Sequence, residues 1–340
     1  RFAHIMPSAR ETSAPASLRE PAPEASPRCV LNARVSGAFV EDERGAMRVD
    51  YACVCAVDNL VSASTREALF ARVGGDEATP SERAWTENFK DHDGETSRTH
   101  GLVDDVLDEL ANEAYAGVGA IGDVMRRVRE TFKEYDVSVA RTDMFSKRGY
   151  DDKDAATRDA QAPARRAHVC ANAVRHTDRF SYHRDVDVRG VEFSGELADV
   201  GRFAGQNRDP NKPRFVTIIV YLNPQWTIDD EGETLFVDED TGVGVVIVPK
   251  PGRVVFMDAD VFHSLKQTRR KVRYSLVIHT LFTARADAGV MARELARPEW
   301  GTPAHVGSAA RLMELIKATS TKRARADGDE PSGREASQTQ

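Results

Sequence analysis

The feature that most constrains the fold is a series of short strand-like segments in the second half of the chain. Between residues 166 and 283, runs rich in β-branched and aromatic residues alternate with clusters of Gly, Pro, Asn and Asp. This pattern is typical of short strands joined by turns. The predicted strands are 215–222, 234–237, 243–248, 253–257 and 273–282. Short strands at this spacing favour an antiparallel sandwich or jelly roll.

The first half of the chain has a different sequence pattern, with one strand-like segment followed by helical ones. Residues 48–57 alternate as a single strand, and Ser64 to Glu67 has the form of a capping box that begins a helix ending near Val73. Two amphipathic helices follow, and two more helical stretches are predicted at 290–296 and 309–318. The apolar positions of the two amphipathic helices are Leu102, Val103, Val106, Leu107 and Leu110, then Val124, Met125, Val128 and Phe132. The predicted class is therefore α+β, a jelly-roll core with supporting N-terminal and C-terminal helices.

Composition divides the chain into five predicted segments. Residues 1–46 begin with a Pro-rich polar stretch and are expected to be disordered, because such a stretch buries too little apolar surface to offset its ordering entropy. Residues 47–160 form a strand plus a helical support region, residues 161–285 the jelly roll, and residues 286–320 the C-terminal helices. The polar tail 321–340 is again expected to be disordered.

Charge and cysteine content exclude several function classes. The net charge of -7 argues against a nucleic-acid-binding protein, which normally has a basic excess. Four cysteines in 340 residues do not make a disulfide framework, and Cys53 and Cys55 have no second pair to complete a zinc site. No apolar run approaches the ~18 residues of a membrane span. We expect a soluble protein with no membrane partner, and the cytoplasm or nucleus is favoured. The chain starts at Arg1, so its true N-terminus and its targeting stay open.

Three side chains in the strand-rich half form a candidate metal site. His183 and Asp185 are spaced as H-x-D, and His263 follows about 80 residues later. Residues i and i+2 of an extended segment point to the same side, so His183 and Asp185 can hold one ion. Two imidazoles and a carboxylate on one face are the ligands of non-haem Fe(II) oxygenases. Arg273, on the next predicted strand, offers a planar guanidinium suited to a bidentate contact with a carboxylate.

Residues 180–282 resemble the catalytic domain of the Fe(II)- and 2-oxoglutarate-dependent dioxygenases, in particular the prolyl 4-hydroxylase and hypoxia-sensing prolyl hydroxylase branch. The opening stretch 49–73 also resembles the first strand and helix of such domains. The matching motifs, in family order, are His183 and Asp185, the strand 214–223 followed by Trp226, the strand 231–236, the segment 251–256, His263, and Arg273 with Tyr274.

The resemblance implies a double-stranded β-helix that binds Fe(II) through His183, Asp185 and His263. It further implies 2-oxoglutarate as co-substrate, bound by Arg273 in a pocket that Tyr221 and Thr217 line, together with O2 and with ascorbate as reductant. The implied reaction hydroxylates a prolyl residue of a protein or peptide and releases succinate and CO2. The oligomeric state stays open.

Alternatives remain at the metal site. A second H-x-D, His176 and Asp178, lies just upstream; we favour the later pair because the aromatic residues Phe180 and Tyr182 lead into it. In another alignment Asn207 stands where a ligand histidine belongs. That alignment would make the protein a non-catalytic sensing or binding module with a degenerate metal site. A cupin-like enzyme without 2-oxoglutarate is a third possibility, which Arg273 disfavours.

Two further expectations concern the pocket. The separation of His183 from Tyr221 implies an insertion at 188–212, which is expected to help form the pocket mouth. His279 shares the predicted strand face of Arg273, so it can point into the barrel, and we expect a hydrogen-bonded histidine of the core or the pocket wall rather than a metal ligand.

Overall fold

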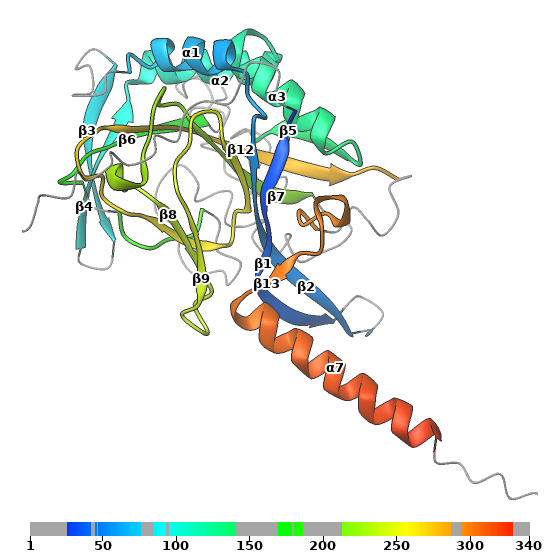
Figure 1. The fold of residues 1–340 in the computed structure, drawn as a ribbon. Coiled ribbons are helices and arrows are strands. Elements are labelled where there is room, and N and C mark those ends of the chain that lie inside the picture. The colour runs from blue at the N-terminus through cyan, green and yellow to red at the C-terminus, as the bar shows by residue number, and fades with distance from the viewer. Residues whose placement is uncertain are drawn as a thin grey trace, which may run out of the picture.

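The computed structural model describes residues 26–41, 45, 47–75, 84–92, 95–140, 169–178, 180–185, 213–286 and 294–328. Within these residues the strands form two sheets, and three helices lie along the upper edge of the view in Figure 1. The larger sheet has ten strands: nine lie on one path, in the order β13-β1-β2-β10-β7-β12-β6-β4-β3, and the tenth, β5, pairs with β12. The smaller sheet has three strands, in the order β11-β8-β9.

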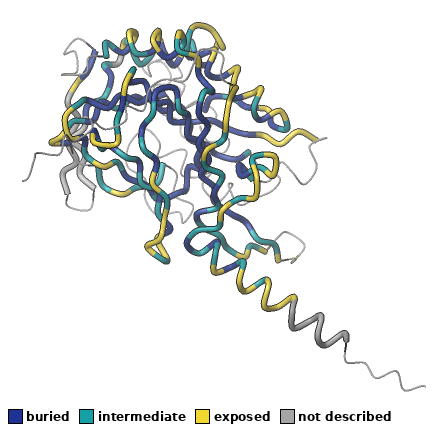
Figure 2. Tube along the Cα trace, in the orientation of Figure 1, coloured by how far each residue is buried: buried dark blue, intermediate teal, exposed yellow. Residues whose placement is uncertain are grey.

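The centre of the large sheet is built from antiparallel strands that are buried on both faces. β7 (Arg214–Tyr221) is buried along its whole length and lies between β10 (Val254–Asp258) and β12 (Arg273–Ala284). Figure 2 shows these strands as the dark blue centre of the molecule. A near-continuous apolar run such as that of β7 is expected where a sheet is covered on both sides.

The small sheet packs against one face of this centre. It consists of β8 (Thr234–Val237), β9 (Gly244–Ile247) and β11 (Phe262–Leu265). The apolar cluster between the two sheets includes Ile219, Phe236 and Met257. Two facing sheets of short antiparallel strands form the predicted jelly-roll core, and the α+β class with a double-stranded β-helix is confirmed.

Helices cover the opposite face of the large sheet. α1 (Ala63–Arg72), α2 (Asp104–Ala116) and α3 (Gly119–Thr131) contribute to a second apolar cluster with the outer side chains of the central strands. The N-cap of α1 is Ser62, two residues before the predicted N-cap Ser64, and its hydroxyl accepts from the Thr65 amide at 3.1 Å. The second helix begins at Asp104, because Leu102 belongs to a strand.

Several strands occupy segments for which the sequence predicts other structure. β1 (Arg28–Glu41) lies within the segment 1–46, so that segment is not disordered throughout; it pairs along β2 (Met47–Asp58), which contains the predicted strand 48–57. β3 (Trp85–His92) and β4 (Glu95–Leu102) form a hairpin where only helices are predicted. β5 (Tyr135–Val139) and β6 (Val169–Val174) both pair with β12.

The C-terminal region also departs from the prediction. Residues 294–296 are not helical, and 290–293 lie outside the described residues, so the predicted helix 290–296 is wrong where it can be compared. Short 3-10 turns occur at η2 (Ile228–Asp230) and η4 (Pro298–Trp300), and β13 (Ala304–His305) pairs with β1. α7 (Gly307–Gly328) includes the predicted stretch 309–318 and continues into the tail predicted to be disordered. No described helix combines the length and apolar character needed to cross a membrane.

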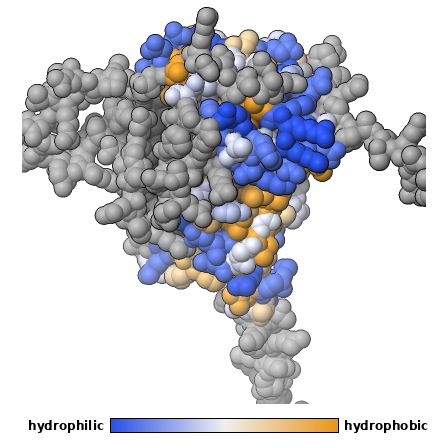
Figure 3. Space-filling model, turned by 90° about the vertical axis from the view of Figure 1, so that its left-hand side faces the viewer, coloured by the Kyte–Doolittle hydropathy of each residue, from blue (hydrophilic) through white to orange (hydrophobic). Residues whose placement is uncertain are grey.

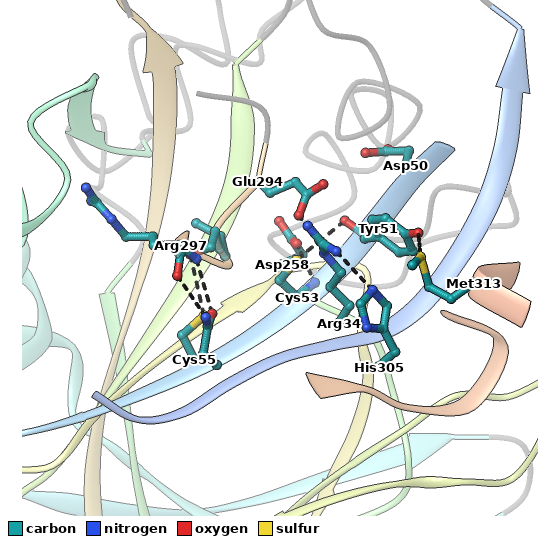
Figure 4. A network of polar contacts seen from close by, with 12 residues as sticks. Arg34, Asp50, Tyr51, Cys53, Cys55, Asp258, Glu294, Arg297, His305 and Met313 are labelled. Atoms are coloured by element: carbon teal, nitrogen blue, oxygen red, sulfur yellow. Dashed lines mark hydrogen bonds and ion pairs between the residues drawn. The ribbon is translucent and has the colours of Figure 1, made fainter. Parts of the chain in front are cut away.

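Polar contacts attach the C-terminal segment to the β1–β2 pair (Figure 4). The guanidinium of Arg34 on β1 donates to Glu294 at 2.8 Å and lies 2.9 Å from Nε2 of His305. The hydroxyl of Tyr51 on β2 lies 3.2 Å from the sulfur of Met313. The first turns of α7 are thereby fixed to the body, whereas the rest of the helix projects away from it (Figure 1).

Candidate metal centre

Strand pairing brings His183 and His263 together. The two residues form an isolated antiparallel bridge in which each amide donates to the carbonyl of the other at 2.9 Å. Their rings are tilted by 48° with centroids 4.4 Å apart. The hydroxyl of Ser264 donates to the Phe180 carbonyl at 2.7 Å and strengthens the same contact. A segment before β7 and a strand well after it therefore present two imidazoles to one point.

Backbone carbonyls determine which ring nitrogens face that point. Nδ1 of His183 lies 3.1 Å from the Ser181 carbonyl, and Nδ1 of His263 lies 3.0 Å from the Val261 carbonyl. A carbonyl only accepts, so each Nδ1 carries a proton, and Nε2 is the ring nitrogen that faces the shared point. This is the arrangement that orients histidine ligands in metal sites.

Asp185 completes the group. Its Oδ1 lies 3.7 Å from Nε2 of His183 and 3.9 Å from Nε2 of His263. One donor atom from each of the three residues can be chosen so that all lie within 4.8 Å of one another, and no other such group of His, Cys, Asp or Glu occurs in the described part of the chain. The structure thus brings together the three predicted ligands.

The electrostatic surroundings favour an ionised Asp185. Burial disfavours the charged carboxylate, but the imidazoles of His263, His279 and His183 and the hydroxyl of Thr217 outweigh burial. The pKa of Asp185 therefore lies below its usual value, and the carboxylate is charged at neutral pH. A carboxylate oxygen beside the Nε2 atoms of two histidines is a suitable donor set for a divalent ion such as Fe(II).

The second H-x-D pair is engaged elsewhere. Nδ1 of His176 lies 3.0 Å from the Thr268 carbonyl. Asp178 is buried, and its Oδ2 accepts from the Arg175 amide at 2.9 Å and lies 3.4 Å from Nδ1 of His100. These contacts explain Asp178 as a cap of the turn after β6. The other alternative, which rests on Asn207, and the proposed insertion 188–212 lie outside the described residues.

A buried cationic pocket lies further along the same interior. Arg273 is 1% exposed, and its Nη2 donates to Thr234 Oγ1 at 3.0 Å. The guanidinium lies over the Tyr221 ring, 4.9 Å from the centroid, and the Tyr221 hydroxyl is 2.8 Å from the same Thr234 oxygen. Burial, opposed by Tyr221 and Glu233, lowers the pKa of Arg273 from its usual value.

The surroundings of Arg273 contain polar atoms without partners among the described residues. Nε and Nη1 of Arg273 and the hydroxyl of Ser275 are buried and make no hydrogen bond. Buried polar groups are normally satisfied, so these three donors suggest a ligand with acceptor oxygens. A carboxylate is the partner that suits a guanidinium.

Gly232 supports the position of Arg273. Its φ is +75°, and a Cβ built there would lie 2.9 Å from Thr268 Cγ2, 3.2 Å from Trp226 Cζ2 and 3.4 Å from Arg273 Cδ. Glycine is therefore required at this point both by the backbone conformation and by the close approach of the arginine stem.

Thr217 and Tyr221 contact different groups. Both belong to the inner face of β7, with Ile219 between them. The Tyr221 ring lies beside Arg273. Thr217 lies beside the candidate metal ligands instead, where its hydroxyl donates to Asp185 Oδ2 at 2.6 Å. The inner face of β7 thus has the candidate ligand group near one end and the buried guanidinium near the other.

The structure places the predicted residues His183, Asp185 and His263 together and Arg273 beside Tyr221, whereas Thr217 lies beside Asp185. Thr234 and Ser275 carry no signal of their own in the sequence, although Ser275 lies two residues after Arg273 and so shares its strand face. His279 is 8% exposed, and its Nδ1 lies 3.2 Å from Thr217 Oγ1.

The outer surface has a mixed character on the face that Figure 3 presents: the coloured residues are mainly hydrophilic, with a smaller band of apolar ones. Beside the site, Tyr182 stacks on Phe262 with centroids 5.1 Å apart, and Arg184 forms an ion pair with Glu239. These side chains alternate with the ligands and therefore face away from the metal position.

Comparison with known proteins agrees with the motifs. Residues 169–280 match the family model described as the 2OG-Fe(II) oxygenase superfamily, so the resemblance is confirmed at that level. The matched segment contains all three candidate ligands and Arg273. No curated protein matches the chain.

Several solved structures are similar to the chain. A 2OG-Fe(II) oxygenase family oxidoreductase from Burkholderia pseudomallei has 12% identity and a TM-score of 0.39, with 67% of this chain and 84% of that one covered. A Pseudomonas putida prolyl-4-hydroxylase has 16% identity and a TM-score of 0.32, with 68% and 93% covered. A Trichoplax adhaerens prolyl hydroxylase, solved with a hypoxia inducible factor peptide fragment, has 13% identity and a TM-score of 0.33, with 68% and 83% covered.

Proposed function

We propose that this protein is an Fe(II)- and 2-oxoglutarate-dependent dioxygenase. The observation that carries the proposal is the presence of two groups on the inner side of the same strands: the triad of His183, Asp185 and His263, and the buried Arg273 with its unpartnered donors. A keto-diacid has two suitable groups: its keto acid can bind a metal held by the triad, and its other carboxylate can bind Arg273. The match of residues 169–280 to the 2OG-Fe(II) oxygenase superfamily supports the same assignment.

In this proposal the metal is held by Nε2 of both histidines and by Oδ1 of Asp185. Bound Fe(II) supplies the activation of O2 and of the keto acid, chemistry that no protein side chain provides. Three protein donor atoms occupy half of an octahedral shell and leave the other half for the co-substrate and O2. The carbonyls of Ser181 and Val261 keep both rings in the required tautomer.

The protein orients the co-substrate from its far end. The guanidinium of Arg273, through a donor that has no protein partner, together with the Ser275 hydroxyl, would bind the distal carboxylate of 2-oxoglutarate. Tyr221 and Thr234 keep the guanidinium in place from its other side. Buried Ile219, Phe236 and Met257 exclude water between the two ends, which strengthens each charged contact.

For the substrate, we propose a prolyl residue of a protein or peptide, with hydroxylation coupled to the release of succinate and CO2. The support is the motif order shared with the prolyl hydroxylase branch. The side chain of His183 is 35% exposed, whereas that of His263 is 6% exposed, so the metal position opens toward the surface on the His183 side. Ascorbate is the reductant we propose for sustained turnover.

The ligand assignment predicts a spectroscopic result. Addition of 2-oxoglutarate to the anaerobic Fe(II) protein should produce a weak visible charge-transfer band, and His183→Ala or His263→Ala should abolish it. His176→Ala is the matched control and should retain the band, because His176 contacts only the Thr268 carbonyl among the contacts described above. A band that survives both ligand substitutions contradicts the assignment, and a band lost in the control favours the upstream pair.

The substrate is tested separately. Succinate release should be measured against a library of proline-containing peptides, and each active peptide should be examined by mass spectrometry for the gain of one oxygen atom. Succinate formation without any oxidised proline would retain the dioxygenase and reject the prolyl substrate.

A further inference from the structure

The two oxygens of Asp185 have different partners. Oδ1 is the atom that lies 3.7 and 3.9 Å from the two histidine Nε2 atoms. Oδ2 accepts from Thr217 Oγ1 at 2.6 Å. The carboxylate is thus already turned so that a single oxygen faces the metal position in the proposed function, on which this inference rests.

Thr217 is itself oriented by a second contact. A hydroxyl has one proton to donate, and an ionised carboxylate can only accept, so the proton of Thr217 is directed to Asp185. Nδ1 of His279 lies 3.2 Å from the same hydroxyl oxygen. Because the hydroxyl proton is committed, this contact is a hydrogen bond only if His279 Nδ1 carries a proton and donates it to Thr217 Oγ1.

The strand register holds this chain of contacts in place. Thr217 and His279 are direct partners in the antiparallel pair of β7 and β12. Thr217 is fully buried and His279 is 8% exposed, so neither side chain has room for another rotamer without disturbing the core. We call the contacts from His279 through Thr217 to Asp185 the relay. Its two donors, Thr217 and His279, lie on buried central strands of the fold, whereas Asp185 follows a short segment held by one bridge.

We propose that His279 is a positioning residue that acts through Thr217 to orient Asp185, so that Oδ1 alone binds the metal. If Oδ2 were released, the carboxylate could rotate and offer both oxygens. A second carboxylate oxygen would occupy one of the positions left for co-substrate and O2. His279 therefore preserves the open half of the metal site without contacting the metal.

The experiment uses the full-length protein and Co(II) alone as the probe. Thr217→Val and His279→Leu remove the hydroxyl and the ring donor. Thr217→Ser keeps the hydroxyl, and His279→Asn keeps an N–H two bonds from Cβ, where Nδ1 stands. Affinity is measured by Co(II) titration. Coordination of Asp185 is measured from the separation of its antisymmetric and symmetric carboxylate stretches, in infrared difference spectra between loaded and metal-free protein. Asp185→Asn identifies the band.

The relay predicts a paired effect. Thr217→Val and His279→Leu should weaken Co(II) binding by about 10–100-fold, the usual effect of losing a group that orients a ligand. They should also narrow the separation of the two stretches, as expected for a carboxylate that binds through both oxygens. Thr217→Ser and His279→Asn should restore both quantities, which a role of His279 in packing alone would not explain.

The contrary outcomes are distinct. If His279→Leu binds Co(II) with the wild-type affinity and stretch separation, the relay is overturned while the dioxygenase proposal stands. An effect of Thr217→Val alone assigns the orientation to Thr217 and also overturns the role of His279. A wild-type chain that binds no Co(II) contradicts the proposed function itself. If His279→Leu does not fold, by circular dichroism, His279→Asn decides: weak binding by a folded variant rejects the relay.

Discussion

Arg273 carries a buried charge that the described protein groups satisfy only in part. Its Nη2 has a partner, whereas Nε and Nη1 have none. Burying a charged group with unsatisfied donors is unfavourable, and burial lowers the pKa of this guanidinium accordingly. The side chain therefore destabilises the ligand-free protein, which is the behaviour expected of a residue retained for binding.

Arg273→Met consequently has opposite effects on stability and on binding. The substitution keeps most of the volume and removes the charge, so the melting temperature of the metal-free protein should rise. Loss of a buried charge pair costs about 2–5 kcal/mol, so the 2-oxoglutarate concentration needed to produce the visible band should rise well over tenfold. The Fe(II) requirement should stay near that of the wild type. Equal losses for iron and for 2-oxoglutarate would contradict the separation of the two ends.

For single residues, the sequence was informative where a charged or metal-binding residue type occurs at a characteristic spacing. The H-x-D pair, the distant histidine and the arginine could be assigned because each residue type has a narrow chemical use. Thr234 and Ser275 could not, because a hydroxyl in a strand is common, and its role depends on which strand lies opposite. The contact of Thr217 with Asp185 likewise depends on tertiary packing.

Among the elements, the turn before β8 determines the shape of the carboxylate pocket. Gly232 and Gly242 both adopt a positive φ, +75° and +67°, but only Gly232 has neighbours: nothing lies within 4 Å of a Cβ built at Gly242. A substitution at Gly242 therefore tests the effect of backbone strain alone, whereas the same substitution at Gly232 adds contacts with neighbouring side chains.

Gly232→Ala and Gly242→Ala should therefore have similar backbone strain but different affinities for 2-oxoglutarate. Each substitution places a Cβ in the left-handed region, at a cost of about 1–2 kcal/mol in the free energy of unfolding. In Gly232→Ala the new methyl group also displaces Thr268 or the stem of Arg273. Only that variant should lose 2-oxoglutarate affinity, measured by titration of the visible band. Equal affinities in the two variants would show that Gly232 does not position the arginine.

The strands with compact apolar patterns were predicted well, and those stabilised by distant pairing were not. The predicted strand 234–237 coincides with β8, and the predicted strand 215–222 overlaps all but one residue of β7. The β3–β4 hairpin is polar over much of its length, and β1 lies in a segment with a Pro-rich beginning. Those strands form because they can pair with the edge of an existing sheet. The local pattern of apolar and polar residues does not reveal such an edge.

For the whole molecule, the C-terminal helix has an anchored part and a projecting part. Leu312 is 6% exposed and belongs to the main apolar cluster, whereas Leu315, less than one turn later, is 60% exposed. Ser308 Oγ accepts from the Gly37 amide at 3.1 Å and lies near the carboxylate of Asp238. The start of α7 thus joins β1 to the turn between β8 and β9.

Leu312→Ala and Leu315→Ala should differ accordingly in stability. Leu312→Ala should lower the free energy of unfolding by about 2–5 kcal/mol, because it leaves a cavity under the helix. Leu315→Ala should change it by no more than about 0.5 kcal/mol. Urea unfolding followed by circular dichroism measures both. Equal losses would mean that the projecting part of α7 has a partner surface in solution.

The bridge between His183 and His263 has a consequence for how the metal position is prepared. Two of the three candidate ligands are joined by reciprocal amide bonds, so the backbone positions from which both imidazoles project are fixed relative to each other. Binding an ion therefore requires only side-chain adjustment of these two residues, and it does not require two distant chain segments to be brought together.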